Sequence, residues 1–329
     1  MGGLIDSFGR SISYLRLSVI DHCNYRCAYC MPNDAMGSRR ADLLGAPDIV
    51  RLARLFTELG VSKIRLTGGE PLLRHDLPEL AAQIRRLPGL ADLSLSTNGH
   101  LLDRRAVRLR QAGIQRLNIS LDSLDPTTFA RITCGGDLIA VRRGIDAALA
   151  AGFSPLKLNM VVLQDINDHE IEQMSEFALS HGVELRFIET MPVGHQGARS
   201  SPHHYPAGKI LERLMRHFGR DLIPLHAGKD AGPARYYRVG SEPLRIGVIS
   251  ALSQHFCDSC NRVRLTAQGD LVLCLGQDNS VPLAQALQTG CTDDEIKHVI
   301  RQAIARKPAR HDFHNPASAP LRPMYSLGG

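Results

Sequence analysis

Three cysteines near the start of the chain, Cys23, Cys27 and Cys30, follow a C-x3-C-x2-C spacing, with the aromatic Tyr29 directly before the third. Three thiolates on one short loop can bind three irons of a [4Fe–4S] cube and leave the fourth iron without a protein ligand. An iron with an open position can bind a small molecule and pass it an electron. A structural zinc loop instead spaces its cysteines in pairs and does not need an aromatic residue inside the loop. This trio therefore predicts an iron–sulfur cluster with one open iron.

The chemistry of such a cluster is specific. The same spacing is the signature of enzymes that cleave S-adenosylmethionine (SAM) reductively and produce a 5′-deoxyadenosyl radical. We therefore expect SAM as a cofactor.

A second trio lies near the other end of the chain: Cys257 and Cys260 in a C-x2-C pair, then Cys274 after thirteen intervening residues. This pattern could hold zinc, with the nearby His255 as a fourth ligand, or a second cluster with an open iron. Taken alone, it favours neither. The first trio favours the cluster, because a cell that assembles one cluster on this chain can assemble another.

The composition is that of an ordinary globular protein, with 43% hydrophobic and 22% charged residues in 329. No apolar run is long enough to cross a bilayer, and the first residues lack the pattern of a signal peptide. We expect a cytoplasmic protein with no membrane partner. In a reducing compartment its eight cysteines are not expected to form disulfides, and six of them belong to the two trios.

Lysines and arginines exceed acidic residues by six charges. No stretch resembles a nucleic-acid-binding motif, so no nucleic-acid partner is expected. Arginines suit phosphates because of their fixed fork of donors, and a small polyanionic ligand would account for part of the excess.

The first 190 residues alternate between patterns of strands and helices. Six strands separated by helices indicate a parallel sheet, either open or curled into a partial barrel. The expected strands are Tyr14–Ile20, Lys63–Thr67, Leu93–Ser96, Arg116–Ser120, Leu156–Val161 and Glu184–Ile188. The expected helices are Pro47–Leu59, Leu77–Arg86, Asp103–Ala112, Ile139–Ala151 and His169–His181.

Polar and glycine-rich turns follow most of these strands. Besides the first cysteine loop, they are Gly68-Gly69-Glu70-Pro71, Ser96-Thr97-Asn98-Gly99, the turn beginning Ser120, and Glu189-Thr190-Met191-Pro192. Ligands of parallel α/β folds lie at the carboxyl ends of the strands. We expect these turns to form one rim around one site.

The pattern changes near residue 190. Gly194–His204 is rich in Gly, Ser, His and Pro and indicates an irregular connection, with His195, His203 and His204 solvated rather than metal-bound. A helix, Ala207–Phe218, and four short strands follow: Arg235–Val239, Leu244–Val248, Arg262–Thr266 and Leu271–Leu273. Two more helices are expected at Leu283–Gln288 and Asp293–Arg306. We divide the chain into a barrel (1–193), a C-terminal cluster domain (194–310) and a flexible tail (311–329) that ends in Gly-Gly.

Together these motifs resemble those of one family. They are the first trio, the run Arg65–Leu72, the run Asn118–Leu124, the second trio with Asn261-Arg262-Val263-Arg264, and the terminal Gly328-Gly329. The chain resembles the GTP 3′,8-cyclases of molybdenum cofactor biosynthesis, members of the radical SAM superfamily, from about Tyr14 to its last residue.

The resemblance implies an incomplete (β/α)6 barrel of the TIM type, with a C-terminal iron–sulfur extension that closes the barrel mouth. It implies two [4Fe–4S] clusters, on Cys23, Cys27 and Cys30 and on Cys257, Cys260 and Cys274. It implies SAM contacts from Tyr29, Gly69, Ser120 and Met191. It implies GTP contacts from Arg16, Arg65, Ser96, Lys157, Arg262, Val263 and Arg264, and catalytic positions at Arg262, Arg264, Gly328 and Gly329.

The implied activity is that of a lyase. A 5′-deoxyadenosyl radical removes hydrogen from C3′ of GTP and becomes 5′-deoxyadenosine. The ribose radical then bonds to C8 of guanine, and one further electron and one proton give (8S)-3′,8-cyclo-7,8-dihydroguanosine 5′-triphosphate. The implied partners are GTP, a cellular one-electron reductant, and the cyclic pyranopterin monophosphate synthase that takes the product. The chain is expected to be a monomer or a homodimer.

Two other interpretations stay open. Radical SAM peptide-modifying maturases also carry cysteines in a C-terminal extension, but usually more than three. A non-enzymatic metal-binding scaffold would hold zinc at the second trio. Cys134 and Cys291 are isolated and have no assigned role.

Overall fold

Twelve strands form one continuous sheet in this computed structural model, which describes residues 3–35, 37–225, 232–241, 245–313 and 320–328. The strand order is β12-β11-β10-β1-β2-β3-β4-β5-β6-β9-β8-β7. The strands are β1 (Tyr14–Ser18), β2 (Lys63–Thr67), β3 (Asp92–Thr97), β4 (Arg116–Ser120), β5 (Leu156–Val162), β6 (Glu184–Glu189), β7 (Leu222–Leu225), β8 (Arg235–Val239), β9 (Arg245–Ile249), β10 (Arg262–Leu265), β11 (Asp270–Val272) and β12 (Ser280–Pro282).

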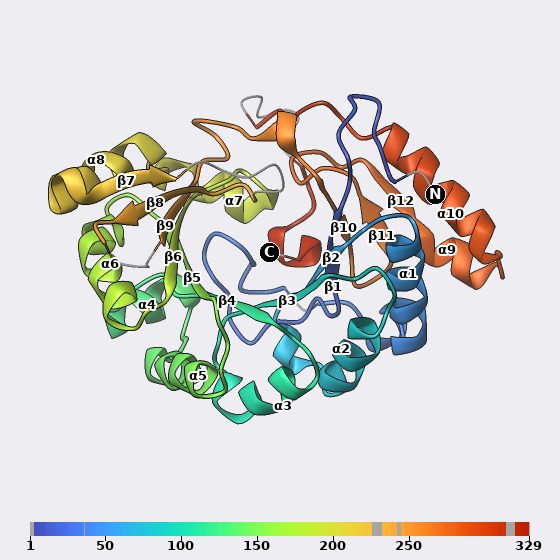
Figure 1. Ribbon diagram of the computed structural model, residues 1–329, viewed down its shortest axis with the longest axis horizontal. Coiled ribbons are helices and arrows are strands. Elements are labelled where there is room, and N and C mark those ends of the chain that lie inside the picture. Colours follow the sequence, from blue (N-terminus) through green and yellow to red (C-terminus); the bar gives the residue numbers. More distant parts are fainter. Residues whose placement is uncertain (1–2, 36, 226–231, 242–244, 314–319, 329) are drawn as a thin grey trace.

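The central strands are all parallel. β1 to β6 pair in sequence order, β10 adds to β1, and β9 adds to β6. The strands curve into an arc with helices along its outer side (Figure 1). No hydrogen-bonded pair among the described strands joins β7 to β12, so the barrel is open. The fold is the expected partial barrel.

The helices cover the outside of the arc because they carry the connections between parallel strands. They are α1 (Ala46–Glu58), α2 (Leu77–Arg85), α3 (Ala106–Gln111), α4 (Pro126–Thr133), α5 (Leu138–Ala150), α6 (Ile171–Ser180), α7 (Gly194–Ser200), α8 (Ala207–Phe218), α9 (Leu283–Gln288) and α10 (Asp293–Ala305). None of the helices in the described ranges is long and apolar enough to span a membrane.

Alternation along the strands separates the core from the interior of the arc. In β2, the side chains of Ile64 and Leu66 are fully buried in the core, whereas Lys63, Arg65 and Thr67 line a cavity inside the arc. Because successive side chains of a strand point to opposite faces, every second residue belongs to each environment. The sheet therefore has an apolar outer face and a polar inner face.

Side-chain caps define where several helices begin. The carboxylate of Asp125 accepts a hydrogen bond from the Thr128 amide at the start of α4, and Asp137 does the same for α5. Thr292 and Glu295 form a reciprocal capping box at the start of α10. Such caps satisfy amides that have no partner within the helix.

Most of the expected elements are confirmed, with three differences. The segment Gly194–His204, expected to be irregular, forms α7 and a short 3-10 turn. α4, β7 and β12 were not expected. The helix expected at Asp103–Ala112 is a 3-10 turn followed by α3. The strand expected at Leu244–Val248 is β9, and its first expected residue, Leu244, lies outside the described residues.

Candidate active site

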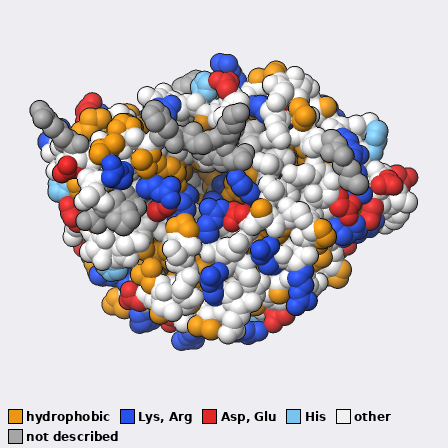
Figure 2. Space-filling view, in the orientation of Figure 1, with side chains coloured by type: hydrophobic (Ala, Val, Ile, Leu, Met, Phe, Trp, Pro, Cys, Tyr) orange, Lys and Arg blue, Asp and Glu red, His pale blue; other side chains and the backbone are white. Residues whose placement is uncertain are grey.

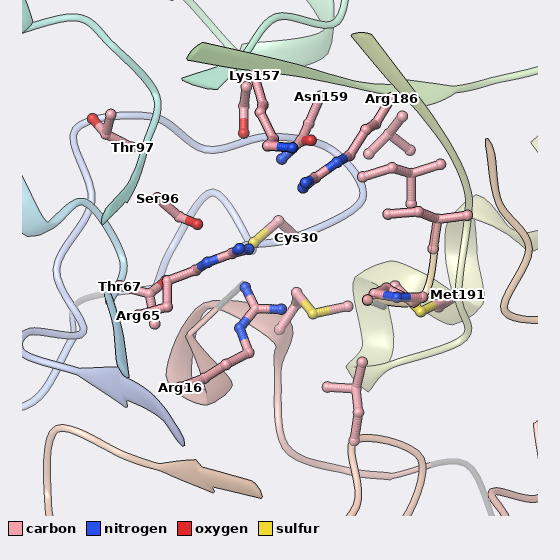
Figure 3. A pocket seen from close by; sticks show the side chains of 18 of the residues that line it. Arg16, Cys30, Arg65, Thr67, Ser96, Thr97, Lys157, Asn159, Arg186 and Met191 are labelled. Carbon is pink, nitrogen blue, oxygen red and sulfur yellow. The ribbon is translucent and has the colours of Figure 1, made fainter. Parts of the chain in front are cut away.

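A cavity of about 440 Å³ lies inside the arc of strands. Figure 2 shows the hollow on this face, with Lys and Arg side chains gathered around it. Most of the residues expected at the site line this one cavity: Cys23, Cys27, Cys30, Tyr29, Gly69, Ser120, Met191, Arg16, Arg65, Ser96, Lys157, Arg262 and Arg264. In Figure 3, Arg16 and Arg65 extend into it from one side and Lys157 and Arg186 from the other.

The first cysteine loop is held against the end of α4. The amide of Arg26 donates to the carbonyl of Thr133, and its guanidinium donates to the carbonyl of Cys23 at 2.6 Å. Within the loop, the amide of Cys30 donates to the carbonyl of Cys27 at 2.8 Å. Arg26 was not expected from the sequence to have this role. Its side chain closes the loop on itself, which holds the three thiols on one side.

Gly69 follows β2 and packs directly on this loop. A Cβ atom added there would lie 2.2 Å from the carbonyl oxygen of His22, closer than real side chains approach backbone. The glycine was expected to allow a ligand to approach the backbone. The structure shows that the neighbour it admits is the backbone next to Cys23.

Glu70 connects two of the rim turns. Its buried carboxylate accepts hydrogen bonds from the amides of Leu72 and Asn98 and from the Thr97 hydroxyl. Burial raises the pKa of Glu70 to about 7, although these donors favour its charged form. The carboxylate keeps the turns after β2 and β3 together beside the first cysteine loop.

The other residues expected to contact SAM lie around the same end of the cavity. The hydroxyl of Tyr29 donates a 2.7 Å hydrogen bond to Asp122, whose other oxygen accepts from the Val161 amide. Ser120 lies at the end of β4 and is exposed to the cavity. Met191 packs against a small apolar cluster that includes Met324 and Leu327.

Three arginines lie side by side on three neighbouring strands. The sheet register pairs Arg264 of β10 with Arg16 of β1, and Arg16 with Arg65 of β2. Burial and the charges of neighbouring arginines lower the pKa of each, that of Arg264 to about 10. Buried like charges are unfavourable without an anion between them. The row is suited to a ligand with several negative charges.

Lys157 adds a fourth cation from β5. Burial, followed by the charge of Arg186, lowers its pKa to about 8 despite an ion pair with Glu184. Ser96 lies across the cavity at the end of β3 (Figure 3).

Three further residues that line the cavity, Arg186, Tyr236 and Asn159, were not expected from the sequence. Arg186 donates to the Tyr236 hydroxyl at 2.7 Å and to the side chain of Asn118 at 3.0 Å, and Asn159 lies beside it on β5. The available signal was the alternation of polar residues along β5 and β6, because inward positions of a barrel strand recur every second residue.

A second cavity of about 80 Å³ adjoins the first, and Met191, Phe256, Leu275, Arg262 and Arg264 line both. Cys257, Cys260, Cys274 and Val263 line only the second. The guanidinium of Arg262 lies 5.2 Å from the centre of the Phe256 ring, at the boundary between the two cavities. The two cysteine trios therefore line two adjoining cavities of one connected site.

The donor sets fit clusters better than single ions. Among the residues the structure describes, no three His, Cys, Asp or Glu side chains are gathered closely enough for one metal ion. The three cysteines of each trio line one cavity, where each thiol could ligate one iron of a cluster. Burial raises the pKa of Cys23 to about 11 and of Cys30 to about 12, so these thiols need a cationic group to become thiolates.

The histidines considered as zinc ligands do not line either cavity. His255 is exposed and contacts His311 edge to face, with ring centres 6.0 Å apart. His311, which was not considered, lines the second cavity. His203 and His204 contact Gln164 and Thr190 respectively, and His195 is exposed.

The end of the chain enters the arc. The 3-10 turn Met324–Leu327 lies in the middle of the arc, drawn in red in Figure 1. The carbonyl of Leu327 accepts a 3.1 Å hydrogen bond from Arg264, and the carbonyl of Gly328 accepts from Thr67 at 2.8 Å. Gly329 lies outside the described residues.

Comparisons with known proteins show the family of this chain. Residues 17–178 match the Radical SAM superfamily, and residues 183–313 match Molybdenum Cofactor Synthesis C. The chain is 48% identical to the GTP 3′,8-cyclase of Hydrogenovibrio crunogenus over 99% of both chains. It is 45% identical to that of Marinobacter nauticus over 99% of this chain and 98% of the relative.

Solved structures support the fold alone. Streptococcus suis SuiB bound to S-adenosylmethionine superposes with a TM-score of 0.64 at 14% identity, covering 88% of this chain and 68% of SuiB. The sequence identity to the GTP 3′,8-cyclases, in contrast, is 45–48% over 99% of this chain, which is high enough to show the family. The chain belongs to the GTP 3′,8-cyclase family of the radical SAM superfamily.

Proposed function

We propose that this chain binds SAM and GTP together in the central cavity and converts GTP to (8S)-3′,8-cyclo-7,8-dihydroguanosine 5′-triphosphate, the first step of molybdenum cofactor biosynthesis. One observation carries the proposal. A single cavity has the first cysteine loop on one side, a row of buried cations on another, and the second cysteine trio next to it.

The family's cofactors are SAM and two [4Fe–4S] clusters. Cys23, Cys27 and Cys30 would hold the first cluster, and Cys257, Cys260 and Cys274 the second. When bound, the first supplies the electron that releases the 5′-deoxyadenosyl radical from SAM, and the second offers an open iron to the guanine.

The residues near the first trio would orient SAM. Tyr29 is fixed by its hydrogen bond to Asp122, so its ring keeps one position beside the cysteines. Ser120 offers a hydroxyl and Met191 an apolar surface to the same space. These contacts would hold the 5′ carbon of SAM toward the interior of the arc, where the ribose of GTP must lie.

The cations would hold the triphosphate. Arg16, Arg65, Arg264 and Lys157 surround the interior, and Arg262 lies at the boundary with the second cavity. A triphosphate offsets the repulsion among these buried charges through charge-assisted hydrogen bonds. With the phosphates anchored there, the guanine would extend toward Cys257, Cys260 and Cys274, and Val263 would line its pocket.

The protein's own task is positioning and exclusion of water. Hydrogen transfer from C3′ requires the two carbons to meet in a closed space. The turn Met324–Leu327 already lies over the cavity, and Gly328 reaches Thr67 on β2. We infer that Gly328 and Gly329 belong to the active site. The carbonyl of Gly328 is bound by Arg16 and Thr67, and a residue without a side chain leaves room for the substrate beside them.

Further parts of the proposal concern the cell. The product would pass to the cyclic pyranopterin monophosphate synthase, and a cellular one-electron donor would reduce the first cluster. The partner synthase, the electron donor and the requirement for reduced thiols all suit a cytoplasmic location. A monomer and a homodimer are distinguishable by mass in solution.

The test is an anaerobic assay. The protein is reconstituted with iron and sulfide, given SAM and a strong reductant, and 5′-deoxyadenosine is measured with GTP, with ATP and without nucleotide. We expect deoxyadenosine to rise with GTP alone, together with a cyclised guanosine product. Equal deoxyadenosine under all three conditions would instead favour the peptide-modifying alternative, and none under any condition would favour the metal-binding scaffold.

A further inference from the structure

Lys307 is a buried cation beside the second cysteine trio. It follows the end of α10, its side chain is only 2% exposed, and its ammonium donates a hydrogen bond to the carbonyl of Leu273, directly before Cys274. It lines the second cavity together with all three cysteines but does not line the central cavity. Lys307 is therefore placed to act on the second cluster rather than on the triphosphate.

No carboxylate of the described part of the chain forms an ion pair with Lys307. Arg10, a further cation near the second trio, donates to the carbonyls of Cys257 and Pro308, but its charge is paired with Asp6 at 2.6 Å. A buried charge without a counter-ion is costly. The charge of Lys307 calls for an anion in the second cavity, and three thiolates bound to a cluster provide one.

The two cysteine trios differ in their charged neighbours. The central cavity, beside the first trio, is lined by carboxylates as well as cations, among them Glu70, Asp92 and Glu189. Among the described residues that line the second cavity there is no Asp or Glu, whereas Lys307, Arg262 and Arg264 line it with the second trio. The described lining of the second cavity therefore carries only positive charge apart from its cysteines, and that of the first carries both signs.

We propose that Lys307 is a positioning residue that compensates the charge of the second cluster, so that it raises the reduction potential of that cluster and holds the Leu273–Cys274 backbone against it. The potential of an iron–sulfur cluster depends on net charge and on surrounding hydrogen bonds. A fixed cation nearby stabilises the reduced form, which carries one more negative charge. The inference rests on the proposed assignment of the second cluster to Cys257, Cys260 and Cys274.

The experiment measures the midpoint potential of the second cluster by itself. A Cys23→Ala protein is the parent, since by the proposed function it keeps only the second cluster, about four irons per chain. In this background Lys307→Met removes charge and hydrogen bond, Lys307→Gln removes the charge but keeps a donor, and Lys307→Arg keeps both. Lys297→Met is the matched control, because Lys297 lies on α10 but pairs with Glu58 on the outer surface.

We expect Lys307→Met and Lys307→Gln to shift the potential to more negative values, by about tenfold in the one-electron equilibrium, or ~59 mV. Lys307→Arg and Lys297→Met should keep the parent potential. If Lys307→Gln kept its full iron content and the midpoint potential of the parent, the proposal would be overturned, because Lys307 would then only hold the carbonyl of Leu273. This holds even if Lys307→Met lost iron. A parent protein without iron would overturn the cluster assignment itself, and with it this inference.

Discussion

The guanidinium of Arg16, on the first strand, donates a 3.0 Å hydrogen bond to the carbonyl oxygen of Gly328, at the opposite end of the chain. The same oxygen accepts from Thr67, and the preceding carbonyl accepts from Arg264. Two of the cations assigned to GTP are thus in contact with the tail. The end of the chain is hydrogen-bonded to the row of arginines that we propose to bind the triphosphate, so a change in the tail is expected to alter substrate binding.

Gly328→Ala should lower product formation by about a hundredfold, as expected when reacting groups are displaced by about 1 Å. The backbone of Gly328 has φ of +78°, and a Cβ atom would lie 2.5 Å from a methyl carbon of Thr67. Gly290→Ala is the matched control: Gly290 has φ of +75° but open space around it. Adding Thr67→Ser, which removes the methyl group, should partly restore activity to Gly328→Ala. Full activity in Gly328→Ala alone would contradict the close fit of the tail.

Arg65→Met should weaken GTP binding while leaving the unliganded protein at least as stable. Loss of a charge-assisted hydrogen bond costs about 1.5–3 kcal/mol, or about ten- to hundredfold in affinity. In the absence of ligand, the same change removes a buried positive charge that is disfavoured by burial and by the neighbouring arginines. Calorimetric GTP titration and thermal unfolding measure the two effects. A clear loss of stability with unchanged affinity would show that Arg65 is structural.

GTP binding should weaken as the pH rises through about 8, because Lys157 loses its charge there. Its pKa lies near 8 in the folded protein, below its ordinary value, since burial disfavours the charged form. Lys157 is therefore charged below pH 8 and neutral above it, and binding above pH 8 must take up a proton. Lys157→Arg should lose this dependence. Measuring the GTP affinity of the wild-type protein and of Lys157→Arg at each pH cancels the effect of titration of the nucleotide itself. If the two affinities fell in parallel as the pH rose, Lys157 would not be the group responsible.

Cys23→Ala and Cys260→Ala should each remove about four of eight irons, with different consequences. Cys23→Ala should abolish deoxyadenosine, because SAM could no longer be reduced. Cys260→Ala should lose the cyclised product, because the guanine end of the site is changed. Cys134→Ala is the control: Cys134 is exposed at the end of α4 and lines neither cavity. Iron analysis and product chromatography check all three, and wild-type turnover by Cys23→Ala would refute the first assignment.

The sequence by itself determined the features that depend on neighbouring residues. The spacing of Cys23, Cys27 and Cys30 places three thiols on one loop wherever that loop lies. The alternation of six strands with helices determined the parallel sheet, because such connections must cross over one face. In a parallel sheet the turns after the strands share one edge, so the rim of Gly69, Ser96, Ser120 and Met191 was predictable as a set.

Short helices were less predictable. α7 contains glycine, histidine and serine, and its local preference for helix is weak. Its buried glycines Gly194 and Gly197 pack against the backbone of Pro323 and Met191, so contacts with distant segments stabilise it. A pattern read along the chain does not contain those contacts.

Only the tertiary structure decided which distant residues meet. The parallel pairing of β1 with β10 places Arg264 beside Arg16, and the course of the tail brings Gly328 to the same guanidinium. Lys307 follows α10, which packs against α1 and α9, and its ammonium reaches the carbonyl directly before Cys274; no spacing in the sequence records that contact. Register and packing between segments far apart in the chain depend on the shape of the whole core. For this reason the candidate metal ligands could be identified in the sequence, whereas the charged residues that lie near them could not.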